Sequence, residues 1–242
     1  MRLFVAMPLI TGLELPLPEG AARHAMVRRV QPGDQLTLFD GSGSDWDATV
    51  LAVTRRDVQV RVGSSMAVHR ELPVQVTLAA VMPANERMDV LVEKASELGV
   101  SWIQPLHSDR SVLRLSGERA QRKQAHWQAV AQAACEQCGR AVVPQVAPVA
   151  NLTEWLSRPR AGERWLLSLA PGAQTPAGRP QPQSTLFTLS GPEGGFTPDE
   201  ETAALAAGFV PIDLGRRVLR AETAPLTVLA WLGLSLPIPG HG

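Results

Sequence analysis

The sequence predicts an α/β protein with a small all-β domain at its N-terminus. Two observations carry this prediction. Short alternating strands with closely spaced turns fill about the first 70 residues, and from residue 74 onward strands alternate with helices, as in a largely parallel sheet. The chain has 242 residues, of which 45% are hydrophobic, so it can form one small and one larger core. We place the domains at 1–72 and 73–242.

The strands of the first domain are predicted from alternating apolar and polar side chains. We expect them at residues 35–39, 46–53 and 58–62, separated by turns at Pro32-Gly33-Asp34 and at 40–43. Short strands joined in this way are typical of a small barrel.

The second domain opens with a more continuously apolar strand at 74–81, which indicates a sheet that is covered on both faces. A helix is expected at 86–98, because apolar side chains recur there at helical spacing. Asn85 can cap the start of this helix and Gly99 can end it. A strand at 102–106 follows.

A longer helix is expected from about Glu118 to Cys138. Cys135 and Cys138 both fall on its apolar stripe, which favours core packing over a redox or zinc site. The sequence contains no second pair of cysteines and no pair of histidines with zinc-finger spacing. We therefore expect neither a disulfide nor a metal site here.

The last third of the chain contains a helix with clear start signals. Thr197 is the expected N-cap, Pro198 the first helical residue and Glu200 the partner in a capping box, and Gly208 ends the helix. The other elements expected here are strands at 142–146, 165–170, 185–190 and 209–214, a mobile proline-rich loop at 171–183 and an apolar final helix at 224–234.

The loop Gly191–Phe196 lies directly between a predicted strand and the capped helix, where open α/β sheets bind their ligands. Its three glycines allow the backbone to approach a ligand closely, and Glu193 adds a polar group that a turn does not need. The loop lacks the phosphate-loop and dinucleotide signatures, which favours a nucleoside-like ligand without a polyphosphate. A simple strand-to-helix turn is the alternative.

A second loop, Leu214–Ala224, also follows a strand and precedes a helix. It contains Arg216, Arg217, Arg220 and Glu222, which a solvated charged turn would also explain. Because both loops follow strands of one parallel sheet, we expect them to share a pocket.

The formal net charge is zero, which argues against a globally basic nucleic-acid binder. Local clusters of positive charge could still contact phosphates, and the run from Arg110 to Lys123 is the strongest of them. The N-terminus does not resemble a signal peptide, and the apolar run 224–237 is too short to span a bilayer comfortably. We expect a soluble cytoplasmic protein that makes no membrane contact.

At the two loops the chain resembles the RsmE-type 16S ribosomal RNA uracil-N3 methyltransferases of the SPOUT superfamily. The most specific matches are Gly191–Thr197 and Leu214–Ala224. The supporting matches are Met1–Val5, His24, Arg29, Leu38–Gly41, Arg87–Asp89, Glu93–Gly99 and Glu136–Arg140. The resemblance implies a PUA-like β-barrel followed by a SPOUT methyltransferase domain with a C-terminal trefoil knot. It also implies a homodimer, S-adenosylmethionine as methyl donor, no metal, and 16S rRNA within the 30S subunit as partner.

The resemblance also implies the residues of the site. The cofactor would bind to Leu167, Ser168, Leu169, Gly191, Pro192, Glu193, Gly194, Gly195, Leu214, Gly215, Arg217, Leu219, Thr223 and Ala224. RNA would contact Arg2, His24, Arg28, Arg29, Arg87, Lys94, Arg110 and Arg140. The chain departs from the family at Ala84 and Asn85, where a basic residue and a glycine are usual, and at Arg28, where an apolar residue is usual. These departures affect the RNA contacts rather than the chemistry.

The catalytic residues are expected in the second loop. The N3 atom of uracil carries a proton and becomes nucleophilic when that proton leaves, so a nearby cation would favour the reactive form. We expect Arg220 to stabilise this uridinate. Glu222 is a candidate base, although an ion pair with an arginine would explain it equally well. The alternatives are a SPOUT methyltransferase for another RNA site, a non-catalytic RNA-binding ribosome-assembly factor, and a small-molecule nucleotide binder.

Overall fold

A computed structural model describes residues 1–84, 87–170, 172–179 and 182–236. Its contacts divide the chain into two compact units, the first made of 1–71 with 135–143 and the second of 72–134 with 144–242. The predicted division placed 135–143 in the second domain, whereas the structure groups this segment with the first unit.

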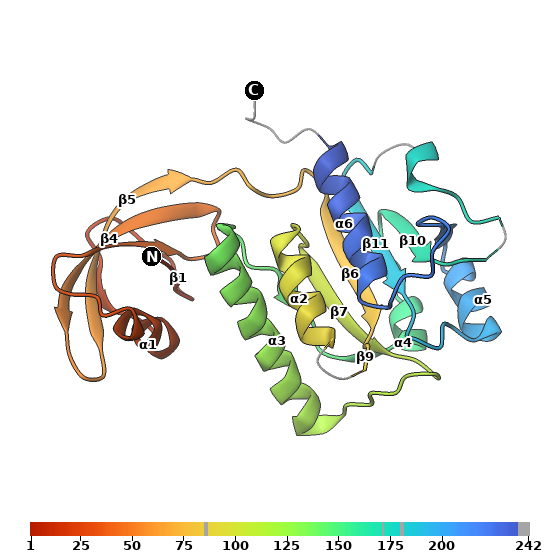
Figure 1. Ribbon diagram of the computed structural model, residues 1–242, viewed down its shortest axis with the longest axis horizontal. Helices are drawn as coiled ribbons and strands as arrows, with labels where there is room; N and C mark the ends of the chain where they lie inside the picture. The colour runs from red at the N-terminus through yellow and green to blue at the C-terminus, as the bar shows by residue number, and fades with distance from the viewer. Residues whose placement is uncertain (85–86, 171, 180–181, 237–242) are drawn as a thin grey trace. The chain divides into compact units, whose positions relative to one another are not determined.

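The first unit is a five-stranded sheet in the order β1-β3-β4-β5-β2, in which only β1 and β3 are parallel. Leu3 of one edge strand and Leu15 of the other lie in the same buried cluster, so the sheet curls around one core (Figure 1). The elements are β1 (Arg2–Phe4), β2 (Glu14–Pro16), α1 (Glu19–Val27), β3 (Gln35–Phe39), β4 (Ser44–Val53) and β5 (Val58–Ala67).

The segment 135–143 is held in the first unit by buried polar contacts. The guanidinium of Arg2 donates to the carbonyl oxygens of Cys135 and Arg140 at 2.7 and 2.8 Å and pairs with Asp45 at 2.7 Å. Arg140, only 3% exposed, donates through Nε to Glu71 at 3.1 Å. Both guanidinium groups, which were predicted to contact RNA, make these contacts inside the unit, and their contact with RNA stays a prediction.

The second unit is built on a seven-stranded sheet whose described strand pairs are parallel. The strand order is β12-β10-β11-β6-β7-β8, and β9 also pairs with β7. The elements are β6 (Gln75–Val81), α2 (Arg87–Glu97), β7 (Trp102–His107), α3 (Gly117–Cys138), β8 (Gln145–Val146), β9 (Ala150–Asn151), α4 (Leu152–Leu156), β10 (Glu163–Leu167), η1 (Pro176–Gly178), β11 (Thr185–Ser190), α5 (Pro198–Ala206), β12 (Val210–Ile212) and α6 (Thr223–Ser235).

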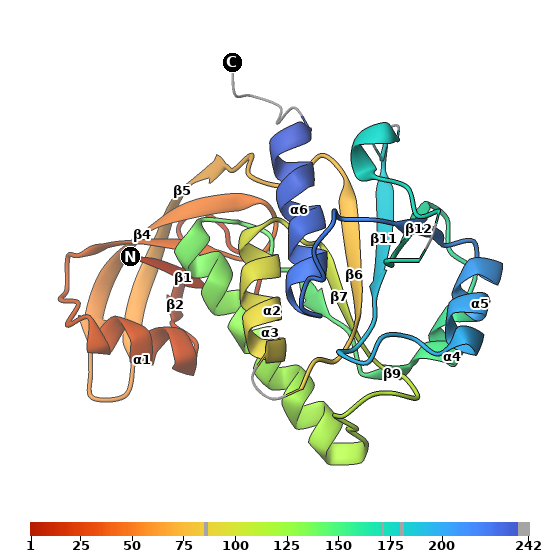
Figure 2. The same ribbon diagram turned by 45° about the vertical axis from the view of Figure 1, so that its right-hand side comes forward.

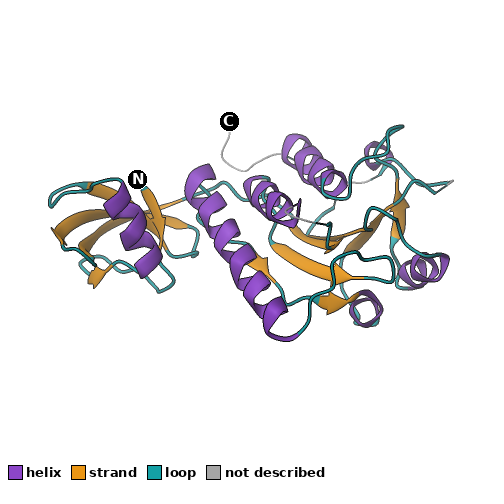
Figure 3. Ribbon diagram, turned by 60° about the horizontal axis from the view of Figure 1, so that its bottom comes forward, coloured by secondary structure: helices purple, strands orange, loops and turns teal. Residues whose placement is uncertain are grey.

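Strand β6 shows how helices cover both faces of this sheet. Val76 and Leu78 lie in a buried cluster with side chains of α2, α3 and α6. Ala79 and Val81 lie in a second cluster with side chains of α4 and α5. Figures 2 and 3 show the strands between these two groups of helices. The prediction of a doubly covered parallel sheet is confirmed.

Most predicted elements of the second unit are present, with shifted ends. The strand expected at 165–170 ends at Leu167, and the one expected at 142–146 contains only Gln145 and Val146. The elements that were not predicted from the sequence are β1, β2, α1, β9, α4 and η1. The predicted cap Asn85 and part of the loop 171–183 lie outside the described residues. No helix in the described ranges is both long and apolar enough to cross a membrane.

Candidate active site

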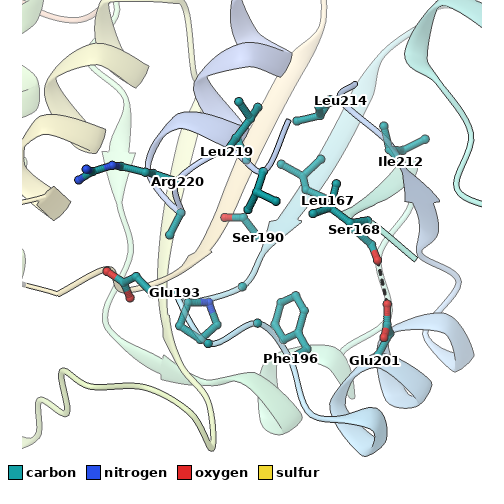
Figure 4. Close-up of a pocket in the computed structure, with 18 of the residues that line it drawn as sticks. Leu167, Ser168, Ser190, Glu193, Phe196, Glu201, Ile212, Leu214, Leu219 and Arg220 are labelled. Atoms are coloured by element: carbon teal, nitrogen blue, oxygen red, sulfur yellow. Dashed lines mark hydrogen bonds between the residues drawn. The ribbon is translucent and has the colours of Figure 1, made fainter. Parts of the chain in front are cut away.

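A cavity of about 630 Å³ lies at the carboxyl ends of β10, β11 and β12 (Figure 4). Both predicted loops line this cavity. Strand β10 lies between β11 and β12 in the sheet, so the residues at the end of β10 line the cavity as well. The lining residues are Leu167, Ser168, Leu169, Ser190, Gly191, Pro192, Glu193, Gly194, Gly195, Phe196, Glu201, Ile212, Leu214, Arg217, Val218, Leu219, Arg220, Ala221 and Ala224.

The structure brings most of the predicted site residues together. Of those predicted to bind the cofactor, only Gly215 and Thr223 are absent from the lining, and Arg220 also lines the cavity. The lining residues that were not predicted individually from the sequence are Ser190, Glu201, Ile212, Val218 and Ala221. Of these, Glu201 could have been predicted from its position, because the first turn of a helix after a glycine loop faces the ligand side of such a sheet.

The glycine loop owes its conformation to particular glycines. Gly195 has a φ of +66°, in the left-handed region that glycine favours, and its N–H donates to Pro192 O at 2.9 Å. A Cβ at Gly191 would lie 3.2 Å from the ring of Phe196, so a side chain there would press on the lining of the cavity.

The helix after the loop begins with the predicted capping box. Thr197 Oγ1 accepts from Glu200 N at 3.2 Å, and Glu200 Oε2 accepts from Thr197 N at 2.8 Å. The other oxygen of Glu200 accepts from Asp109 N at 2.8 Å, which ties the loop after β7 to this helix.

Glu193 connects the glycine loop to the start of α2. Its Oε1 accepts from Ala84 N at 3.1 Å and from Arg87 Nη1 at 2.9 Å. The same guanidinium reaches toward the second loop, where Arg87 Nε lies 3.9 Å from Glu222 Oε1. Glu222 does not line the cavity, and its side chain is only 14% exposed. Of its two predicted roles, the structure shows the ion pair, with Arg87 as the partner.

Arg110 holds the glycine loop through its backbone. Its Nη1 donates to Gly194 O at 2.8 Å and to Phe196 O at 3.0 Å. Arg110 was predicted to contact RNA, and in the structure its Nη1 donates to the glycine loop.

The cavity is apolar in its middle and polar at its two ends. Figure 4 shows Leu167 and Leu219 between two polar regions. At one end Ser168 Oγ donates to Glu201 Oε1 at 2.9 Å, and at the other lies Arg220. The hydroxyl of Ser190 is buried, and none of the described residues offers it a hydrogen bond. This arrangement suits an elongated ligand with an apolar centre and charged or hydroxylated ends.

Comparison with known proteins agrees with this geometry. Models of the RNA methyltransferase domain and the RNA methyltransferase PUA domain match residues 70–233 and 17–63. Ribosomal RNA small subunit methyltransferase E from Synechocystis is 33% identical over 87% of this chain and 69% of the relative. The chain belongs to this RNA methyltransferase family. The fold prediction is therefore confirmed as a PUA domain followed by an α/β methyltransferase domain.

Solved structures of the family align over almost the whole chain. The ribosomal RNA small subunit methyltransferase E of Neisseria gonorrhoeae, bound to S-adenosyl methionine, is 35% identical with a TM-score of 0.91 and covers 97% of both chains. A Legionella pneumophila protein in complex with the bound cofactor SAM is 33% identical, also with a TM-score of 0.91 and 97% of both chains covered.

The remaining basic residues predicted to contact RNA lie at the surface. Arg28 and Arg29 follow α1 and are exposed. His24 Nδ1 lies 3.5 Å from a carboxylate oxygen of Glu136 within the first unit. Lys94 donates to two carboxylates of α2 at 2.7 Å each, and these hydrogen bonds raise its pKa, so it stays a cation at neutral pH.

Proposed function

We propose that the chain transfers a methyl group from S-adenosylmethionine to N3 of a uridine in 16S rRNA. The observation that carries the proposal is the cavity in which both glycine-containing loops meet at the strand ends. Its support from outside the chain is the 35% identity to a family member that was crystallised with S-adenosyl methionine.

The residues present fit this cofactor. The cavity, at about 630 Å³, lies within the range of roughly 300–1,000 Å³ for small-molecule sites. We assign the adenine to the apolar centre formed by Leu167, Leu214 and Leu219, and the backbone contacts to the loop 191–195. The buried Ser190 hydroxyl is an unused hydrogen-bonding group in the same cavity. When bound, the cofactor supplies an electrophilic methyl group on a sulfonium.

The residues of the chain have three tasks in this reaction. The cavity walls exclude water and hold the uracil in line with the methyl group, and positioning of this kind supplies much of the acceleration. The N3 proton must leave before the methyl group arrives. We propose that it passes to solvent water as the uracil enters the site, and we assign Arg220 to stabilise the resulting negative charge on the ring. We assign Glu222 to its ion pair with Arg87 rather than to proton transfer, because the cavity lining does not include it.

The RNA partner is proposed to be 16S rRNA within the 30S subunit. Arg28 and Arg29 of the PUA domain are exposed and suit phosphate contacts, with His24 and Lys94 as further candidates for RNA contact. Cytoplasmic location follows from this substrate.

We also propose the trefoil knot and the homodimer. Strand β12 lies at the edge of the sheet, whereas α6 packs against α2 and β11, so residues 213–222 must cross back over β10. This return path supports a knotted C-terminus. The dimer is supported by the apolar character of α6, where Leu234 is 90% exposed and Trp231 is partly exposed.

The test uses small ribosomal subunits from a strain that lacks the endogenous enzyme. Incubation with the protein and S-adenosylmethionine should yield N3-methyluridine at one position, located by mass spectrometry. Arg220→Ala should abolish the product while cofactor binding persists. Arg216→Ala is the control, because it removes the same charge from the same loop outside the cavity lining. Methylation of another atom would indicate a different RNA reaction, and failure to bind the cofactor would favour a non-catalytic assembly factor.

A further inference from the structure

Two arginines hold the glycine loop from outside the cavity. Arg87 begins α2, which follows β6, and Arg110 lies in the loop that follows β7. Strands β6 and β7 are the next two in the sheet beyond β11, which leads into the glycine loop. Neither arginine lines the cavity, yet both donate to the loop that does.

Two peptide units that Arg110 contacts through their oxygens are also held through their N–H groups. The peptide group is planar, so its C=O and N–H point in opposite directions. In the unit between Gly194 and Gly195, the oxygen accepts from Arg110 and the N–H donates to Pro192 O. In the unit between Phe196 and Thr197, the oxygen accepts from Arg110 and the N–H donates to the Glu200 carboxylate.

The contact of Arg87 fixes a third point of the same loop. The Glu193 carboxylate, in the middle of the loop, accepts from both Arg87 and Ala84 N. The loop is therefore held in its middle by Arg87 and in its second half by Arg110. A loop whose peptide units are fixed in advance loses less conformational freedom when a ligand binds.

We propose that Arg87 and Arg110 are positioning residues that preorganise the glycine loop for the cofactor. Both residues were predicted to contact RNA. An RNA phosphate on the donating nitrogen of Arg110 would have to displace two loop carbonyls, each within 3.0 Å. The inference rests on the proposed cofactor site.

The test compares the full-length protein with Arg110→Met, which keeps the unbranched stem but removes the donors. Titration calorimetry with S-adenosylmethionine should show a Kd that rises roughly tenfold or more, because two charge-assisted hydrogen bonds are lost. Arg87→Met should weaken binding less, since Ala84 N still holds Glu193. Arg158→Met is the control, because it removes the same charge from an exposed position after α4.

Two further measurements separate positioning from RNA binding. Hydrogen exchange in a peptide covering residues 191–197 should be faster in Arg110→Met than in the control, with no ligand present. The affinity for a single-stranded RNA oligonucleotide should fall equally in Arg110→Met and Arg158→Met across a range of salt concentrations.

Unchanged exchange and unchanged cofactor affinity in Arg110→Met, together with a selective loss of RNA affinity, would overturn the inference. Wild-type protein that does not bind S-adenosylmethionine would instead refute the proposed function, and the exchange comparison would still test the hold on the loop.

Discussion

Replacement of Glu200 by alanine should release two backbone segments at once. The Glu200 carboxylate, in a residue that is only 8% exposed, accepts from Thr197 N and from Asp109 N at 2.8 Å each. The first bond closes the capping box of α5, and the second ties down the loop after β7. Without the carboxylate, both N–H groups lose their acceptor.

The expected magnitude follows from these two bonds. A hydrogen bond to a charged group contributes about 1.5–3 kcal/mol, so the loss of two costs at least about 3 kcal/mol. Asp199→Ala is the matched control, because Asp199 lies in the same helical turn and is exposed. It loses only the interaction with the helix dipole, about 0.5 kcal/mol. The difference between the variants should be about 2.5 kcal/mol.

Urea unfolding followed by tryptophan fluorescence measures this difference in the second unit, which contains Glu200. All tryptophans except Trp46 belong to the second unit, so the fluorescence reports mainly on the sheet that carries the site. A difference of about 2.5 kcal/mol corresponds to roughly 5–10 °C in Tm for a protein of this size. If Glu200→Ala lowers the free energy of unfolding no more than Asp199→Ala does, the Glu200 carboxylate does not hold the two segments.

Three further predictions concern other parts of the molecule. Arg2→Met should lower the stability of the first unit by about 3 kcal/mol, because it leaves the largely buried carboxylate of Asp45 without its partner. The control Arg61→Met breaks an exposed ion pair and should cost less than about 1 kcal/mol. Urea unfolding followed by circular dichroism measures both. Gly195→Ala should raise the Kd for S-adenosylmethionine, since alanine at a φ of +66° costs about 1–2 kcal/mol, whereas Gly20→Ala, which meets open space, should leave the Kd unchanged. A hydrogen bond with the neighbouring thiol and burial both raise the pKa of Cys135, so iodoacetamide should modify it slowly at pH 8 until the protein is unfolded; rapid native labelling seen by mass spectrometry would contradict this.

The sequence predicted the fold best where a pattern repeats over many residues. The apolar strand at 74–81 indicated burial on both faces, and the box at Thr197 located α5. Helix α1 was missed because its buried face is made of alanines, which carry little periodic signal. Helix α4 is only five residues long, although Asn151 caps it through hydrogen bonds with Thr153 N and Glu154 N.

The site was predictable in position but not in its internal contacts. Parallel sheets bind ligands beyond the carboxyl ends of their strands, and this rule was enough to place both loops around one pocket. The rule could not show that Arg87 pairs with Glu222 or that Arg110 donates to loop carbonyls. An arginine in a sequence indicates a positive charge, but it does not indicate which group the guanidinium will contact. The Ser168–Glu201 hydrogen bond joins residues 33 apart and has no local signal.

The first unit is made of two separate segments of the chain, and this has a consequence for folding during translation. A ribosome that has added residue 71 has made every strand of that unit, yet the carbonyl groups that accept from Arg2 belong to residues 135 and 140. Much of the second unit, including β6 and β7, is translated in between. The two units therefore mature in an interleaved order rather than one after the other, although domains usually fold as units from the N-terminus onward. A gene fragment meant to yield the PUA domain alone would have to graft the end of α3 onto it.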